Sequence, residues 1–125
     1  MILCDTNIFI HAFNGDKNTI EELNRIGHEN IALSVITVME LYQGMGNKKE
    51  LEIMKKRIRY YDFIEIGIPV SKLALEFMEQ FNLSHGLKIP DAIIAATAVT
   101  HQIELYTYNV KDFRFVPDIK LYGLE

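Results

Sequence analysis

Four short apolar runs, separated by segments with helical patterns, constrain the fold of this chain more than any other feature. The runs occupy residues 2–4, 31–34, 62–67 and 103–107, and the third of them alternates between apolar and polar residues. Each interval between them is long enough for the crossover connection that parallel strands require. The sequence therefore predicts an α/β fold with a mostly parallel sheet of four strands and helices on both faces. A fifth, edge strand is expected if residues 120–124 join the sheet.

The intervals carry distinct helix signals. Residues 6–13 form a short apolar segment, and Asn18 with Glu21 has the spacing of a capping box for a second helix that runs to about Arg25. A third helix is expected from the end of the second apolar run to Tyr42, before two glycines, and a basic helix follows it. One long apolar stripe predicts an amphipathic helix through Val70, Leu73, Ala74, Phe77, Met78 and Phe81. Pro90 begins a helix that is apolar on nearly all sides, as expected of a central packed helix.

The length of 125 residues fits a single domain over residues 1–125. The first residues lack a basic segment ahead of their apolar run and carry a charge at Asp5, so they resemble neither a signal peptide nor a membrane span. The lone Cys4 lies inside an apolar run, where a buried thiol is expected rather than a disulfide. These features predict a cytoplasmic protein without a membrane partner.

Polar side chains fall where parallel strands would end. Asp5 follows the first run, Glu40 lies in the helix after the second, Asp91 begins the apolar helix, and Asn109 lies two residues beyond the fourth run. Ligands of open α/β sheets bind beyond the carboxyl ends of the strands. Clustered carboxylates resist ionising together unless a cation is present, and oxygen ligands select Mg²⁺ or Mn²⁺ over zinc. The pattern is typical of metal-assisted attack of water on a phosphodiester.

Four sequence blocks carry a family resemblance over nearly the whole chain. They are "LCDTNIFI", "LSVITVMELYQG", "IPDAIIAATA" and "LYTYNVKDF", in that order. They resemble the signature blocks of PIN-domain ribonucleases, and most of all the VapC-type toxins of toxin–antitoxin pairs. The resemblance implies a metal-dependent endoribonuclease with a PIN-like fold and Mg²⁺ or Mn²⁺ as cofactor. It also implies an RNA substrate, a cognate antitoxin that fills the active-site groove, and a homodimer.

The resemblance also assigns roles to residues. It implies that Asp5, Asp91 and Glu40 are catalytic and occupy the acidic metal positions, with Glu40 acting partly through water or as a general base. Asn7 and Thr107 match polar positions that support the ligands. Many relatives have a fourth acid where this chain has Asn109, which is therefore also a catalytic candidate.

The amide of Asn109 offers an oxygen but no charge, and Asp112 lies three residues further on. Asp112 is consequently a candidate metal ligand if it turns inward. The number of ions, one or two, stays open at this point.

Each of these residues also has a purely structural interpretation. Asp91 after Pro90 is an ordinary helix start, Asp5 is a suitable helix N-cap, and Asn109 is a common turn residue. Glu40 lies three residues after Thr37, which is capping-box spacing. The functional interpretation is favoured because helix-start rules do not require these residues to follow successive strands.

A basic stretch stands out in an acidic chain. The net charge is −4 overall, whereas the segment from residue 47 to 61 contains six basic and two acidic side chains. Such a segment is most often a solvated helix face, but in a ribonuclease it is also the best candidate for phosphate contact. The candidate RNA contacts are Lys48, Lys49, Lys55, Lys56, Arg57 and Arg59.

Three other functions compete with a toxin ribonuclease. The same fold could serve RNA processing or structure-specific DNA cleavage without an antitoxin. The missing acid at Asn109 motivates a non-catalytic PIN-like binding module. A phosphatase with Asp5 as the nucleophile is disfavoured, because such enzymes usually carry a second acid two residues further on, where this chain has Asn7.

Overall fold

The computed structural model describes residues 1–124, and within them four strands form one parallel sheet. The strands lie in the order β3-β2-β1-β4. Their bounds are β1 Ile2–Cys4, β2 Ile31–Ser34, β3 Asp62–Ile64 and β4 Glu104–Tyr106. Leu3 pairs with Ala32 on one side and with Leu105 on the other, so β1 is central and its carboxyl end lies between those of β2 and β4.

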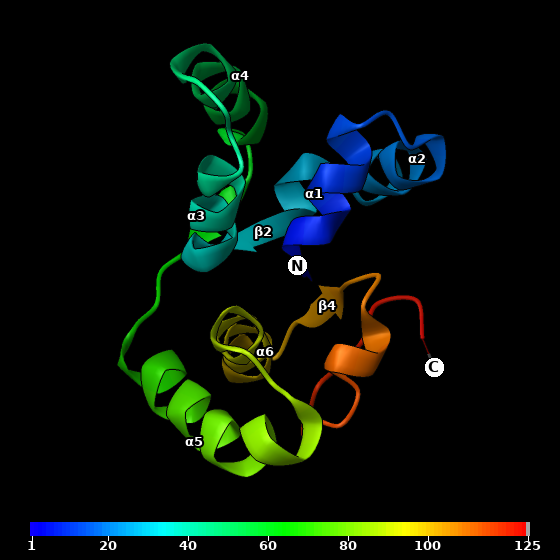
Figure 1. The fold of residues 1–125 in the computed structure, drawn as a ribbon. Coiled ribbons are helices and arrows are strands. Elements are labelled where there is room, and N and C mark those ends of the chain that lie inside the picture. Colours follow the sequence, from blue (N-terminus) through cyan, green and yellow to red (C-terminus); the bar gives the residue numbers. More distant parts are fainter. Residues whose placement is uncertain (125) are drawn as a thin grey trace.

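Helices fill each connection between consecutive strands, as the sequence predicts. They are α1 Thr6–Phe13, α2 Lys17–Ile26, α3 Val35–Gln43, α4 Lys48–Ile58, α5 Ile68–His85 and α6 Ile89–His101, with short 3₁₀ turns at His28–Asn30 and Val110–Asp112. In Figure 1, α1 to α4 lie on one side of the strands and α5 and α6 on the other. The predicted α/β class with helices on both faces is therefore confirmed.

Alternation along the strands divides the core into two layers. Leu3 and Leu105 point into a cluster with residues of α5 and α6, whereas their neighbours Cys4 and Tyr106 point into a cluster with α1 to α4. Leu3, Cys4 and Leu105 are fully buried. Each buried aliphatic side chain of this size stabilises the fold by about 1.5 to 3 kcal/mol, so both helical layers hold the central strand in place.

Small side chains let α6 pack close to the sheet and to α5. Ala92, Ala95, Ala96 and Ala98 are all buried on α6. The helix begins one residue before Pro90, and it ends at Gln102, which adopts a left-handed conformation with φ of 55°. This packing fixes the first turn of α6, including Asp91, relative to the carboxyl end of β1.

One predicted helix start, that of α2, is wrong in detail, whereas α3 starts directly after the second run as predicted. Helix α2 is capped by Asp16, whose Oδ1 accepts from the Asn18 N–H at 3.2 Å, so Asn18 lies inside the helix and does not cap it. Helix α3 is capped by Ser34, whose Oγ accepts from the Ile36 N–H at 3.2 Å. The capping-box interpretation of Glu40 therefore fails, because Ser34 and not Thr37 caps the helix and Glu40 lies in the second turn of α3.

Two strand predictions were too long. The third run is extended only as far as Ile64, and β4 ends at Tyr106, one residue before Thr107. Within the described part of residues 120–124, pairing with the sheet is limited to an isolated parallel bridge between Leu105 and Leu121. The outer side of β4 is nevertheless covered, since Leu105 donates to Lys120 O and accepts from the Tyr122 N–H, both at 2.8 Å.

No helix in residues 1–124 is both long enough and apolar enough to cross a membrane.

Candidate active site

Asp5 lies at the carboxyl end of the central strand and is the most buried of the candidate residues. Only 4% of its surface is exposed. One carboxylate oxygen accepts from the Thr6 N–H at 2.8 Å, which makes Asp5 the N-cap of α1 as well as a site residue. The other oxygen accepts from the Thr107 hydroxyl at 2.8 Å and from the Asn7 side-chain amide at 3.3 Å. Both predicted supporting residues therefore contact Asp5.

Burial raises the pKa of Asp5 above its ordinary value. The hydrogen bonds from Thr107 and Thr6 oppose this change, because they stabilise the charged form. The charges of Glu40 and Asp112 add to the increase. Asp5 is thus a carboxylate held in a defined orientation at a position where a cation would favour its ionised form.

Glu40 reaches the same region from α3. Its Oε1 accepts from the Thr6 hydroxyl at 2.8 Å, and Thr6 is the residue next to Asp5. Glu40 also borders a hollow of about 260 Å³ between α1, α3 and α4, which Phe13 and Met54 line. Thr6, which lies 34 positions before Glu40, therefore links Glu40 to the adjacent Asp5.

Asp91 lies in the first turn of α6 and is half-buried. Burial raises its pKa to about 7, with further contributions from the charges of Asp5, Asp112 and Glu40, whereas Lys88 acts in the opposite direction. The helix-start interpretation is correct for its position, but a surface cap would not experience three neighbouring carboxylates. The fold thus brings Asp5, Glu40, Asp91 and Asp112 into one acidic region.

Asp112 and Asn109 differ in their relation to that region. Asp112 lies in the turn Val110–Asp112, is half-buried, and is among the charges that raise the pKa of both Asp5 and Asp91. Asn109 is exposed and contributes its backbone N–H, which donates to Thr107 Oγ1 at 3.0 Å. This arrangement favours Asp112 over Asn109 as the fourth acidic group.

The chemistry of the donors fits a hard divalent cation. The side chains facing the region offer carboxylate oxygens, which suit Mg²⁺ or Mn²⁺. Within residues 1–124, no group of three or more Asp, Glu, His or Cys side chains is arranged so that it could hold a metal ion. Mg²⁺ usually keeps several waters and binds only one or two carboxylates directly, so a site for it does not require three protein ligands.

The predicted RNA-contact residues lie on or just after α4, and all six are exposed. Some of these side chains have partners within the chain: Lys55 pairs with Glu52 at 3.7 Å, and the Arg57 guanidinium lies 5.2 Å from the centre of the Phe13 ring. Arg57 and Phe13 line a hollow that continues towards the one bordered by Glu40. The basic helix is thus a solvated face whose inner margin approaches the acidic region.

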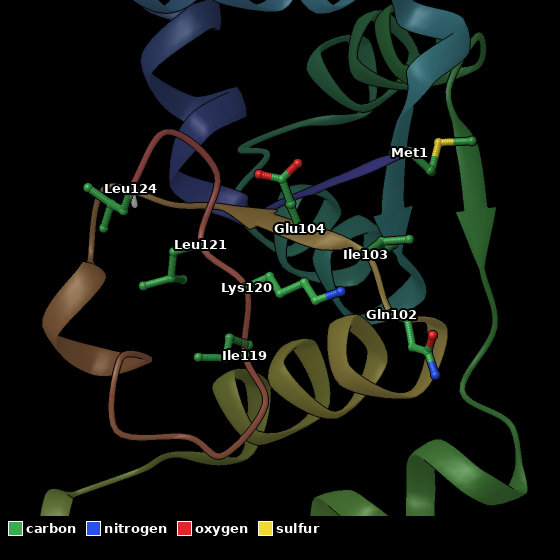
Figure 2. A pocket seen from close by; sticks show the side chains of 8 residues that line it. All are labelled: Met1, Gln102, Ile103, Glu104, Ile119, Lys120, Leu121 and Leu124. Atoms are coloured by element: carbon green, nitrogen blue, oxygen red, sulfur yellow. The ribbon is translucent and has the colours of Figure 1, made fainter.

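A hollow of about 520 Å³ lies at the opposite ends of the strands. Figure 2 shows its lining around Met1 and Glu104, which precede or begin β1 and β4, with the Lys120 side chain crossing it. It is separated from Asp5 and Thr107 by the length of the strands. The hollow therefore does not belong to the acidic region.

Two residues of the site were not predicted from the sequence. Thr6 orients Glu40, and Tyr108 donates its backbone N–H to Asn7 Oδ1 at 3.4 Å. Both adjoin predicted residues in the quoted blocks, so adjacency was the available signal. Their roles depend on contacts between segments that are distant in sequence.

Comparisons with known proteins identify the family of this chain. The family model described as PIN domain matches residues 2–118. Ribonuclease VapC2 of Rickettsia felis is 30% identical over 131 residues, covering 95% of this chain and 94% of the relative. Ribonuclease VapC19 of Mycobacterium tuberculosis is 27% identical, covering 96% of this chain and 98% of the relative.

Solved structures show the same fold. A toxin–antitoxin complex from Klebsiella pneumoniae contains a chain with 31% identity and a TM-score of 0.81, with 95% of each chain covered. The structure of VapBC2 from Rickettsia felis bound to a DNA fragment from their promoter gives a TM-score of 0.82 at 25% identity, with full coverage of both chains.

Proposed function

This chain belongs to the PIN domain family, and on that basis we propose that it is a Mg²⁺- or Mn²⁺-dependent endoribonuclease, the toxin of a toxin–antitoxin pair. The observation that carries the proposal is the placement of Asp5. It is a buried carboxylate at the end of the central strand, held by Thr107 and surrounded by the charges of Glu40, Asp91 and Asp112. Relatives named as ribonucleases and neighbours solved as toxin–antitoxin complexes support the substrate and the biological role.

The residues divide the work of hydrolysis between them. Asp5 and Asp91 would hold the ion, with Asp112 as an outer acid, and the bound ion would supply charge neutralisation at the phosphodiester and acidify water. Thr107 and Asn7 keep the Asp5 carboxylate in one orientation. Thr6 orients Glu40, which accepts a proton from the attacking water. The oxygen of that water forms the new bond to phosphorus, and the bond from phosphorus to the leaving ribose oxygen breaks.

The antitoxin is the proposed regulator of this site. The hollow beside Glu40 is lined mainly by apolar side chains, among them Ile10, Phe13, Leu41 and Met54. An apolar partner segment seated there would lie against the acidic region and exclude RNA from it. This location supports inhibition by direct obstruction of the site. The proposed compartment is the cytoplasm, where the RNA substrate is found.

A homodimer is also part of the proposal. Ile68, Leu75 and Ile89 on α5 and α6 are exposed by 73%, 67% and 63%. Leu75 and Ile89 also line an apolar hollow of about 290 Å³ with Met78 and Ile93. Contiguous exposed apolar surface of this kind is typical of a protein interface, and a second copy of the chain is the proposed occupant.

The test is cleavage of an end-labelled single-stranded RNA by the purified chain. We expect cleavage with Mn²⁺ or Mg²⁺, none with EDTA, and a loss of at least 10³-fold in Asp5→Asn. Asp62→Asn, which neutralises an exposed carboxylate on β3, is the matched control and should cleave normally. Metal-independent cleavage, or full activity of Asp5→Asn, would contradict the proposal.

A further inference from the structure

Tyr108 is an exposed aromatic residue whose backbone adjoins the acidic region. It leaves 42% of its surface accessible. The residue before it, Thr107, donates its hydroxyl to Asp5, and the Tyr108 N–H donates to Asn7 Oδ1. A flat aromatic surface therefore lies one residue away from a group that orients the central carboxylate.

The Tyr108 ring is held rigidly. Its hydroxyl bonds to the hydroxyl of Thr19 and, at 3.0 Å, to that of Tyr106. Thr19 is fully buried and donates to Asp16 at 2.9 Å. Because the ionised Asp16 carboxylate can only accept, the hydroxyls align from Tyr106 through Tyr108 and Thr19 to Asp16. The His11 ring packs against Tyr108 at 4.8 Å between centres, so the ring would lose little freedom on contact with a ligand.

Tyr108 also borders a hollow of about 570 Å³ between α2 and the C-terminal segment. Tyr106 and Tyr122 line the hollow with it, and Glu22 and Arg25 of α2 provide charged groups. Arg25 donates to Tyr122 Oη at 3.2 Å, and both Arg25 and Tyr122 donate to the Glu22 carboxylate. The lining thus combines aromatic rings with hydrogen-bond donors and acceptors.

We propose that Tyr108 and this hollow form a subsite for an unpaired nucleobase next to the scissile phosphate. The inference rests on the proposed ribonuclease function and adds the part of the substrate that is recognised. Aromatic side chains near a backbone path bind unpaired bases by stacking. The positive charge of Arg25 in the lining is compensated by its ion pair with Glu22, and the Glu22 carboxylate would repel a phosphate but can accept from the edge of a base, so the base and not the backbone is the expected occupant.

The first test compares three variants on a single-stranded RNA with a mapped cleavage site. Tyr108→Ala should lower kcat/KM by about 5- to 150-fold, the range for loss of one base–aromatic stack. Tyr108→Phe keeps the ring and should remain within about 3-fold of the wild type. Phe63→Ala is the matched control, because Phe63 is exposed to a similar extent, 43%, and lies on β3 at the opposite edge of the sheet.

The second test removes the base instead of the ring. RNAs with a single abasic nucleotide, scanned across the cleavage site, should include one position that the wild-type protein cleaves at least about 5-fold more slowly. Tyr108→Ala should cleave that abasic RNA no more than about 2-fold more slowly than the wild type does, because the two changes remove the same contact. The abasic scan with the wild-type protein tests the subsite even if Tyr108→Ala fails to fold.

Several outcomes would overturn the subsite. One is full cleavage activity of Tyr108→Ala, and a second is a loss of activity in this variant that is equally large on intact and on abasic RNA. A third is cleavage by the wild type at the same rate whichever nucleotide is abasic, and a fourth is a Tyr108→Ala variant that is impaired only in antitoxin binding. A third measurement separates the subsite from the proposed function: binding of fluorescent RNA to Asp5→Asn with and without Tyr108→Ala. Tyr108-dependent binding by a chain whose wild type cuts no RNA would refute the nuclease and keep the subsite.

Discussion

Asp91 tests the electrostatic description of the site, because its carboxylate is predicted to oppose folding when no cation is bound. Its pKa rises from an ordinary 3.8 to about 7, first through burial and then through the charges of Asp5, Asp112 and Glu40. Such a change corresponds to about 4 kcal/mol against the charged folded form. Asp91 is only half-buried, so screening by solvent reduces the expected cost to about 2 kcal/mol.

The sign follows from proton binding. Between pH 4 and 7 the folded chain holds a proton on Asp91 that the unfolded chain has released, so the contribution of this group to stability falls as the pH rises. Asp91→Asn lacks the titrating group. In EDTA we expect this variant to match the wild type at pH 4 and to exceed it by about 2 kcal/mol at pH 8, or by about 8 °C in Tm.

Urea unfolding monitored by circular dichroism at pH 4 and pH 8 measures this difference directly. Asp62→Asn is the control, since neutralising an exposed carboxylate should change the free energy of unfolding by less than about 0.5 kcal/mol at either pH. Adding Mn²⁺ at pH 8 should reverse the order, because an ion at 100 times its Kd stabilises the wild type by about 2.7 kcal/mol. Equal stability of Asp91→Asn and the wild type at pH 8 in EDTA would refute the reasoning.

Four further predictions follow from the same contacts. Thr107→Val keeps the side-chain shape but removes the hydroxyl that donates to the buried Asp5 carboxylate, so urea unfolding at pH 8 should show a loss of about 1.5 to 3 kcal/mol and calorimetry a 10- to 100-fold weaker Kd for Mn²⁺. Asp112→Asn should slow RNA cleavage by at least about 10-fold, whereas Asn109→Ala should stay within about 3-fold; the reverse order would move the fourth acidic position to Asn109. If three of the six basic side chains on or next to α4 meet phosphates, RNA affinity measured by fluorescence anisotropy should fall about 20-fold between 50 and 200 mM salt, and a flat response would exclude that role. Leu75→Glu should shift the sedimentation coefficient from dimer to monomer, and an unchanged value would place the interface elsewhere.

The fold could be predicted because apolar patterning determines it. The central strand β1 and its neighbour β2 are short, almost wholly apolar runs, as expected when helices cover both faces of a parallel sheet, whereas β3 at the edge is largely exposed. The stripe through Val70, Ala74 and Phe77 and the small apolar residues of α6 identify the helices that cover one face. Turn and cap details were less accessible, because Asn18 and Asp16 both suit a helix start, and in the structure Asp16 accepts from the Asn18 N–H and from the Thr19 hydroxyl, which also bonds to Tyr108.

The candidate acids and two of their supporting residues, Asn7 and Thr107, could be placed together from the sequence, whereas the remaining supporting contacts could not. Asp5, Glu40 and Asp91 could be placed near one another because they follow the ends of parallel strands or lie in helices beside them. The choice between Asn109 and Asp112 depends on how the turn Val110–Asp112 folds back, which no periodic pattern encodes. Thr6 and Tyr108 acquire their roles through contacts across 34 and 101 positions, so the sequence offers only their adjacency to predicted residues.

The central claim is that these carboxylates bind a divalent cation at the carboxyl end of β1. A crystal structure of the Mn²⁺-loaded chain, with the ion located by anomalous scattering, tests it most directly. We expect the ion to be ligated by Asp5, Asp91 or both, with carboxylate oxygens about 2.0 to 2.3 Å away, and Asp112 or Glu40 reached through water. An ion bound away from Asp5 and Asp91, or no ion at saturating Mn²⁺, would contradict the claim.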